Sequence, residues 1–235
     1  MLAPMPRAVR RRRAAGLFGG ALLVAGLSAC AGLGQPAPYD SPGINGLEIP
    51  TPSPAPGDFV DVVDNPWLAL EPGTTRHYDV TEDGRSLGSI DVEVLDGTSE
   101  VAGLTATAVR TVTDVDGEAE DETRFYAQDA DGNVWLVGAD SDTGVSWRAG
   151  EDDAEAGLAM PADPRLGDGW LAFRLPHLLE PRTTVEDQSR EMVQTRESSG
   201  GEADTTRRVY ETGVGLTGVE DLDAGWQAQL DQPSG

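Results

Sequence analysis

The chain has 235 residues, and its 41 acidic residues far outnumber its 17 arginines, with no lysine present, so that its formal net charge is −24 at pH 7. This balance argues against nucleic acid as a partner and against a polybasic contact with anionic lipid, because both need clustered Lys and Arg. The single cysteine, Cys30, excludes an internal disulfide.

The first 29 residues have the layout of an export signal. Five arginines precede any acidic residue, and an apolar run, GLFGGALLVAGL, follows over 16–27. At about 12 residues this run is too short for a transmembrane helix, which needs roughly 20. The order of a charged, an apolar and a small-residue region therefore predicts a signal peptide over 1–29.

The signal ends in Leu27-Ser28-Ala29-Cys30. This stretch resembles the lipobox of bacterial lipoproteins, in which an aliphatic and two small residues precede a required cysteine. The resemblance implies a thioether-linked lipid on Cys30 and an acyl chain on the new N-terminus. More than one chain gives stable anchoring, at about 0.8 kcal/mol per buried CH₂. We therefore expect a lipid-anchored protein on the extracytoplasmic face of the cell membrane. The alternative is an ordinary signal peptide with an incidental cysteine.

Residues 30–57 are predicted to form a lipidated tether. Seven prolines lie between residues 31 and 57, among Gly, Ala and Ser. Such a composition favours extended conformations and cannot bury a core; at about 3.1 Å per residue the segment spans up to roughly 80 Å. The remaining residues, 58–235, have the length of one domain.

That domain is predicted to be all-β. In SIDVEV (89–94) apolar and polar residues alternate, which is typical of a half-buried strand. Further strands are expected at 75–80, 105–115, 122–128, 133–137, 170–175, 190–195 and 207–211. Asp-Gly pairs between several of them predict tight hairpins, and hence an antiparallel meander. Residues 150–169 are expected to be mostly irregular, with one helical turn near 152–156.

Several short segments of the domain carry a family resemblance. They are NPWLALEPG (65–73), YAQD (126–129) with GNVW (132–135), SWRAG (146–150), AGLAMP (156–161) and YETGVGL (210–216). Together they resemble a family of bacterial exported proteins and lipoproteins without an assigned activity. The resemblance covers about 65–216, departs from the family pattern at 175–182, and implies an all-β domain but no catalytic residues.

A more distant similarity is to the curved antiparallel sheet of periplasmic lipoprotein carriers. Those half-barrels hold acyl chains on their concave face, although fold alone does not dictate function. We therefore expect a curved sheet or half-barrel, with a closed barrel or a β-sandwich as the alternatives.

The sequence contains no convincing catalytic, metal or cofactor motif. The two histidines, His77 and His177, have no metal-ligand spacing, and no Gly-x-Ser-x-Gly elbow is present. Acidic stretches near Gly117 and Gly132 lack the spacing of an EF-hand and fit hairpin turns. These observations predict a protein that is not an enzyme and that needs no metal or cofactor.

The five tryptophans offer the remaining functional signal. Core packing is their simplest explanation, and the sharper one is that Trp135 and Trp147 line a site for an apolar ligand or lipid. The sequence thus predicts a membrane-anchored envelope lipoprotein that binds such a ligand. The alternatives are an envelope hydrolase with an unrecognised site, and a purely structural or partner-binding lipoprotein.

Overall fold

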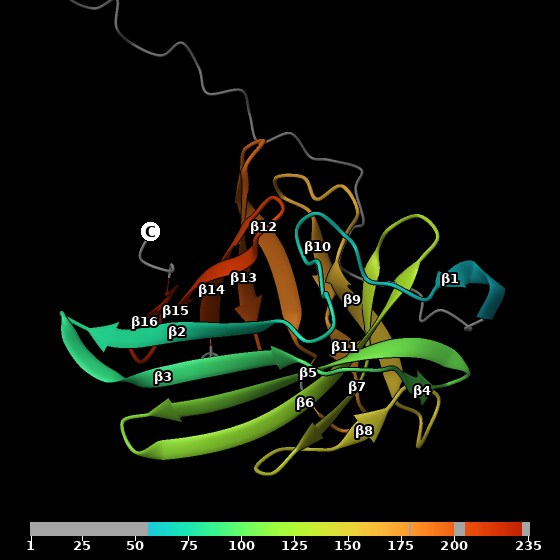
Figure 1. Cartoon of the computed structure of the whole chain (residues 1–235), viewed down its shortest axis with the longest axis horizontal. Coiled ribbons are helices and arrows are strands. Elements are labelled where there is room, and N and C mark those ends of the chain that lie inside the picture. The colour runs from blue at the N-terminus through green and yellow to red at the C-terminus, as the bar shows by residue number, and fades with distance from the viewer. Residues whose placement is uncertain (1–55, 179, 200–204, 232–235) are drawn as a thin grey trace, which may run out of the picture. The chain divides into compact units, whose positions relative to one another are not determined.

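A computed structural model of the chain describes residues 56–178, 180–199 and 205–231 (Figure 1). All of them belong to one compact unit, Pro38–Gly235. The signal peptide predicted at 1–29, the lipidated Cys30 and nearly all of the tether 30–57 lie outside the described residues, and so remain predictions.

The regular secondary structure of the described residues is almost entirely β-strand. The first half of the chain contains η1 (Pro56–Asp58), β1 (Phe59–Val60), β2 (Thr75–Glu82), β3 (Arg85–Val94), β4 (Ser99–Val101), β5 (Leu104–Val115), β6 (Glu118–Asp129) and β7 (Val134–Ser141). The second half contains β8 (Trp147–Arg148), β9 (Glu155–Met160), β10 (Gly169–Leu171), β11 (Phe173–Arg174), β12 (Arg182–Gln188), β13 (Met192–Ser198), β14 (Thr205–Glu211), β15 (Gly215–Asp221) and β16 (Gln227–Leu230).

Thirteen of these strands form an antiparallel meander in the order β10-β12-β13-β14-β15-β16-β2-β3-β5-β6-β7-β9-β11. The short strands β1, β4 and β8 pair with β6, β5 and β7. The sheet curls through 322° into a nearly closed barrel with one unsealed seam. The predicted all-β antiparallel meander is thus confirmed, and its curvature lies between the half-barrel and the closed barrel that we considered.

The two ends of the strand order are neighbours in the chain. Strand β10 pairs with β12 and β11 pairs with β9, so the chain changes partner at Ala172. A Cβ on Gly157 of β9 would lie 2.3 Å from the carbonyl carbon of Ala172. A glycine is therefore required at residue 157, because the two backbones approach too closely for any side chain.

The Asp-Gly turns occur where the sequence predicts them. Asp83-Gly84 joins β2 to β3 with φ values of 49° and 79°, and Asp116-Gly117 joins β5 to β6 with 53° and 85°. Positive φ at both central residues is the signature of the type I′ hairpin, which Asp and Gly tolerate best. These two turns confirm the hairpin predictions.

Residues 150–169 differ from the expectation. Instead of a helical turn at 152–156, the chain forms β9, whose Ala156, Leu158 and Met160 are buried. Gly157 is buried between them, so the strand is covered on both faces and its sequence shows no alternation of apolar and polar residues. A strand buried on both faces lacks the two-residue alternation of apolar and polar side chains by which a half-buried strand is recognised in sequence.

The segment 61–74 between β1 and β2, which we call the plug segment, fills one end of the barrel. Its Val63, Trp67 and Leu70 are buried in one cluster with apolar side chains of β5, β7, β9, β10, β12, β13 and β14. A second cluster joins Tyr78, Val80, Ile90 and Ala228 nearer the β2–β3 turn. The barrel therefore has one end closed by its own chain, called the plug end below.

Candidate functional site

Strand β6 directs charged side chains toward the barrel interior. Buried Val94 pairs with buried Val109, and Val109 pairs with Arg124. Partners in an antiparallel pair lie on the same face of the sheet, and so do residues two positions apart. Arg124 therefore faces the interior, together with Glu122 and Tyr126.

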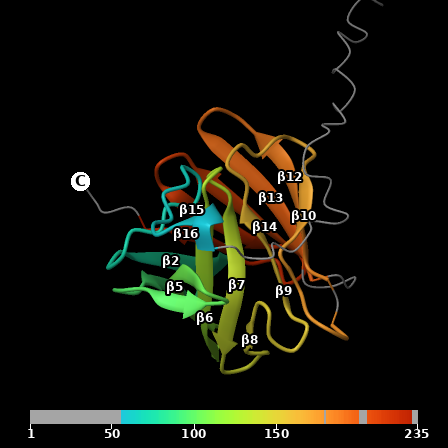
Figure 2. The same cartoon turned by 90° about the vertical axis from the view of Figure 1, so that its right-hand side faces the viewer.

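A second wall contributes a similar set from β13 and β14. Buried Val185 pairs with buried Thr195, and Thr195 pairs with Arg208. By the same alternation Glu197 and Tyr210 face inward. Strands β6 and β14 are six places apart in the strand order, and Figures 1 and 2 show β12–β14 and β5–β7 as separate walls of the barrel.

The charges of the two walls influence each other across the interior. Burial alone lowers the pKa of Arg124, but nearby Tyr126, Glu122 and, from the opposite wall, Glu197 outweigh it and leave this pKa above its ordinary value. Glu197 likewise raises the pKa of Arg208 against burial, while Arg124 opposes that rise. Both arginines therefore stay charged and share one electrostatic environment.

Among the described residues, each of the two arginines forms an ion pair with one glutamate, at the Nε edge of its guanidinium group. Arg124 Nε donates to Glu122 at 2.7 Å, and Arg208 Nε lies 2.9 Å from the Glu197 carboxylate. Solvent still reaches 35% of the Arg124 side chain and 25% of that of Arg208. Both side chains are thus only partly buried. We call Glu122, Arg124, Tyr126, Glu197, Arg208 and Tyr210 the interior cluster.

The end of the barrel opposite the plug contains a cavity of about 660 Å³. The β2–β3 and β5–β6 hairpins and the β15–β16 turn supply its lining, with Leu87, Val115 and Trp226 as apolar side chains and several acids around them. Thr113 and Glu120 both line it and pair across β5 and β6. The next inward pairs on the same face are Thr111–Glu122 and Val109–Arg124, so the interior cluster lies further along the same strand face than the cavity.

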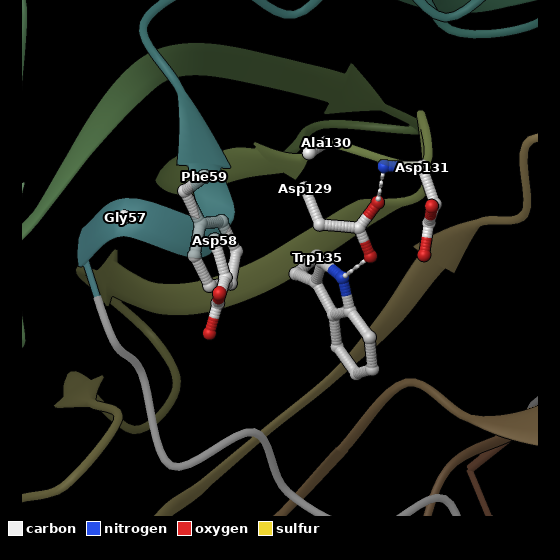
Figure 3. A pocket seen from close by; sticks show the side chains of 7 residues that line it. All are labelled: Gly57, Asp58, Phe59, Asp129, Ala130, Asp131 and Trp135. Carbon is white, nitrogen blue, oxygen red and sulfur yellow. Dashed lines mark hydrogen bonds between the residues drawn. The ribbon is translucent and has the colours of Figure 1, made fainter.

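Trp135 lies in a different cavity, shown in Figure 3. This cavity of about 290 Å³ is formed by η1, β1 and the β6–β7 turn. The Trp135 indole Nε1 donates to Asp129 at 2.9 Å, and the same carboxylate accepts hydrogen bonds from the backbone N–H groups of Asp131 and Asn133. Both side chains therefore stabilise the hairpin turn.

Trp147 lines a third cavity, of about 440 Å³, with Val145, Leu175 and Leu178. Its ring is buried and packs on Phe173 with 5.1 Å between the ring centroids. The two tryptophans that we expected beside one ligand thus line separate cavities. A role for either of them in ligand binding remains a prediction.

Three of the segments that carry the family resemblance meet in one hydrogen-bonded node at the plug end. Buried Asn65 donates through Nδ2 to the carbonyl oxygens of Gly132 and Pro161, at 2.9 and 3.0 Å. Its Oδ1 accepts from the Trp67 N–H at 2.8 Å, and its own N–H donates to Gln128 Oε1 at 2.9 Å. Three motifs far apart in sequence therefore fix the plug on the sheet, which is a structural role.

A histidine, an aspartate and a serine lie together on the outside of β2 and β3, but not in the order of a nucleophilic triad. His77 Nδ1 is 2.6 Å from Asp91 Oδ1, and Ser89 Oγ donates to the other carboxylate oxygen at 3.4 Å. In a triad the histidine stands between the serine and the acid, whereas here Asp91 is in the middle. No group of three potential metal ligands occurs within 56–178, 180–199 and 205–231.

The interior cluster was not predicted from the sequence. Its two arginines are ordinary strand residues in sequence, and only the register shows that they face inward.

No helix in the part of the chain that the structure describes is long and apolar enough to cross a membrane. The chain matches no family model and shows no significant similarity to a curated protein or to a solved structure.

Proposed function

We propose that this chain is a membrane-anchored envelope lipoprotein, without enzymatic activity, that binds an amphipathic small molecule or lipid in its barrel. The observation that carries the proposal is the interior cluster, where partly exposed charged side chains of opposite walls face the barrel interior. The predicted lipidation of Cys30 supplies the anchor, and the predicted tether carries the barrel away from the membrane surface.

The open-end cavity supports binding of a small molecule. Its volume of about 660 Å³ is within the usual range of ligand sites, roughly 300–1,000 Å³. Such sites combine an apolar surface with a few orienting polar groups. Here Leu87, Val115 and Trp226 supply the first, and the interior cluster, further along the same strand face, supplies the second.

The protonation states in the interior also suit recognition. Glu122 and Glu197 are each paired with an arginine, so neither is a free carboxylate. Burial raises the pKa of Tyr126 and of Tyr210, so both phenols stay protonated at neutral pH and available as hydrogen-bond donors. Fixed donors and paired charges orient a ligand, whereas a general base requires an unpaired group with a pKa near neutrality.

Native mass spectrometry of the full chain carrying Cys30→Ser, purified from bacterial membranes or periplasm, tests the proposal. We expect a bound mass that solvent extraction removes. Thr113→Trp should fill the cavity and abolish this mass, whereas Val112→Trp, on the other face of β5, should leave it. The bare polypeptide mass in every preparation would favour a structural lipoprotein instead.

Detergent partitioning tests the anchor. The wild-type chain should enter the detergent phase, and Cys30→Ser should move it to the aqueous phase or leave an unprocessed precursor, because lipidation requires the thiol. Identical aqueous partitioning of both chains would contradict the anchor and leave the binding proposal intact.

A further inference from the structure

We propose that Arg124 and Arg208 bind the oxyanion head of the amphipathic ligand, a carboxylate or a phosphate, while its apolar chain extends toward the open end. This inference rests on the proposed binding function and specifies the class of ligand. It follows from the hydrogen-bonding capacity that the two guanidinium groups retain, and from the direction in which the interior opens.

Within the described part of the chain, each interior arginine has one carboxylate partner, which lies at the Nε edge. The outward arginines differ, because Arg110 binds Asp121 through Nε and Nη2, and Arg148 binds Asp140 through both terminal nitrogens. A planar guanidinium fork matches a carboxylate or phosphate in two parallel hydrogen bonds. The interior forks are therefore the groups best suited to an oxyanion.

The charges of the two arginines oppose each other across the interior. The charge of Arg124 counteracts the rise in the pKa of Arg208, although the residues belong to opposite walls. Two cations in an enclosed space favour an anion between them, since the low local dielectric strengthens each attraction.

Several donors on the wall of Arg208 lack hydrogen-bond partners. The Nε proton of Arg208 itself is not aligned on an acceptor, although Glu197 is close. Thr195, directly opposite Arg208 in the β13–β14 register, is fully buried with its Oγ1 unpartnered, and so is the indole Nε1 of Trp170 on β10. Buried polar groups without a partner cost stability, and in native proteins they commonly indicate a missing ligand or water. This wall is therefore a place for acceptor atoms.

The stretch between the interior cluster and the open end has the length of an alkyl chain, with apolar side chains from β3 and polar ones from β5 and β6. From Val109, which pairs with Arg124, to Val115 at the mouth is six residues of strand, about 20 Å at 3.3 Å per residue. Ile90 and Val92 face the same part of the interior from β3, where they pack in one apolar cluster with Val115 and Trp226, so a ligand chain there would pack among these side chains. Glu118 and Glu120 at the mouth disfavour small hydrated anions, so burial of the chain must supply much of the affinity.

Four probes with the same twelve-carbon chain test the inference on the full chain carrying Cys30→Ser, after solvent extraction. They are dodecanoate, dodecyl phosphate, dodecanol and dodecyltrimethylammonium, each titrated calorimetrically below its micellar concentration. We expect the two anions to bind about tenfold or more tighter than dodecanol, and the cation weakest. The ranking of dodecanoate against dodecyl phosphate distinguishes a carboxylate head from a phosphate head.

Substitutions separate recognition from structure. Arg124→Gln and Arg208→Gln should remove most of the anion preference and leave dodecanol binding unchanged. Arg110→Gln and Arg207→Gln are controls, because they remove outward-facing, ion-paired arginines of β5 and β14. They should change neither the anion preference nor the binding of dodecanol. Glu122→Gln should strengthen anion binding, because a competing carboxylate is lost. If Arg208→Gln does not fold, Arg208→Lys replaces it in the test. This variant keeps the positive charge but lacks the planar guanidinium group, and should show a reduced preference for the anionic probes.

The outcomes are distinguishable. Equal affinity for dodecanol and both anions, or an anion preference that survives Arg124→Gln and Arg208→Gln, overturns the inference and leaves the binding function in place. Preference for the ammonium probe overturns it in favour of the acidic mouth. Failure of all four probes to bind refutes the proposed binding function itself.

Discussion

The two ends of the barrel are built from the same strands, but the residues on the inner face differ in polarity between them. At the plug end, Val109 on β5 packs in one cluster with Val63 and Trp67 of the plug segment. Only two residues further along the same face, Thr111 begins a polar surface that continues through Thr113 to the open-end cavity. The inner face of one continuous strand is thus apolar core at one end and partly polar toward the other.

The hydrogen bonds follow the same division. At the plug end the polar atoms of the Asn65 side chain are all used, by the backbone of three separate segments. Around the interior cluster, Arg124 and Arg208 have one carboxylate partner each, and the buried Thr195 hydroxyl has no partner within the described residues. A fully satisfied network rigidifies a fold, whereas a partly satisfied one leaves capacity for a ligand. We therefore expect substitutions at the two ends to differ sharply in their effect on stability.

The largest effect is expected for Asn65→Ala. The change leaves the Gly132 and Pro161 carbonyls and the Trp67 N–H without a partner in a buried place, and should lower the free energy of unfolding by about 3 kcal/mol. Urea denaturation measures it. Asp61→Ala, an exposed change in the same segment, is the control and should be nearly neutral. A small effect of Asn65→Ala would remove the distinction between the two ends.

A matched pair of glycines gives the next test. Gly132 and Gly117 both occupy hairpin turns, with φ of 89° and 85°, but a side chain at residue 132 would place its Cβ 3.3 Å from Ala162 Cβ, whereas residue 117 has open space. We expect Gly132→Val to lower the free energy of unfolding by about 2 kcal/mol and Gly117→Val by about 1 kcal/mol. Backbone strain at positive φ is common to both variants, whereas crowding occurs only at residue 132. Thermal denaturation of both variants should show this order; equal shifts would contradict it.

Adjacent positions on one strand face locate the boundary between the ends. Val109→Thr buries a hydroxyl in the plug-end core and should lower stability by about 1.5 kcal/mol. Thr111→Val, one step toward the open end, should change stability by no more than about 0.5 kcal/mol. Chemical denaturation of both variants measures the difference. If instead Thr111→Val stabilises the protein strongly, the open end is core and not a solvated surface.

The smallest effect concerns a charge on the outer face. A hydrogen bond with Asp91 raises the pKa of His77, so the protonated histidine stabilises the folded state. This contribution is fully present below the unfolded pKa of about 6.5 and is lost as the pH rises through the higher folded value. Because both side chains are about half exposed, the change should be slight and should disappear at high salt. The free energy of unfolding, measured from pH 5 to 9, should depend less on pH in His77→Gln than in the wild-type chain.

Local sequence determined a large part of the fold. The alternation at 89–94 identifies β3, and Asp-Gly pairs locate two of the hairpins, because both signals depend only on neighbouring residues. Strands β9 and β12 are among those that were not predicted. One is buried on both faces, and the other, RTTVEDQ, has a bulge between Val185 and Asp187 that interrupts its period.

The site depended on tertiary structure. Arg124 and Arg208 are 84 positions apart and come together only because thirteen strands curl through 322°. Whether a strand residue faces inward is decided by register and bulges; the extra residue at Val137 in β7, for example, reverses the alternation near Trp135. The sequence thus determined which segments become strands, since that is a local preference. Only the closure of the sheet, a non-local property, decided which charged side chains face one another inside it.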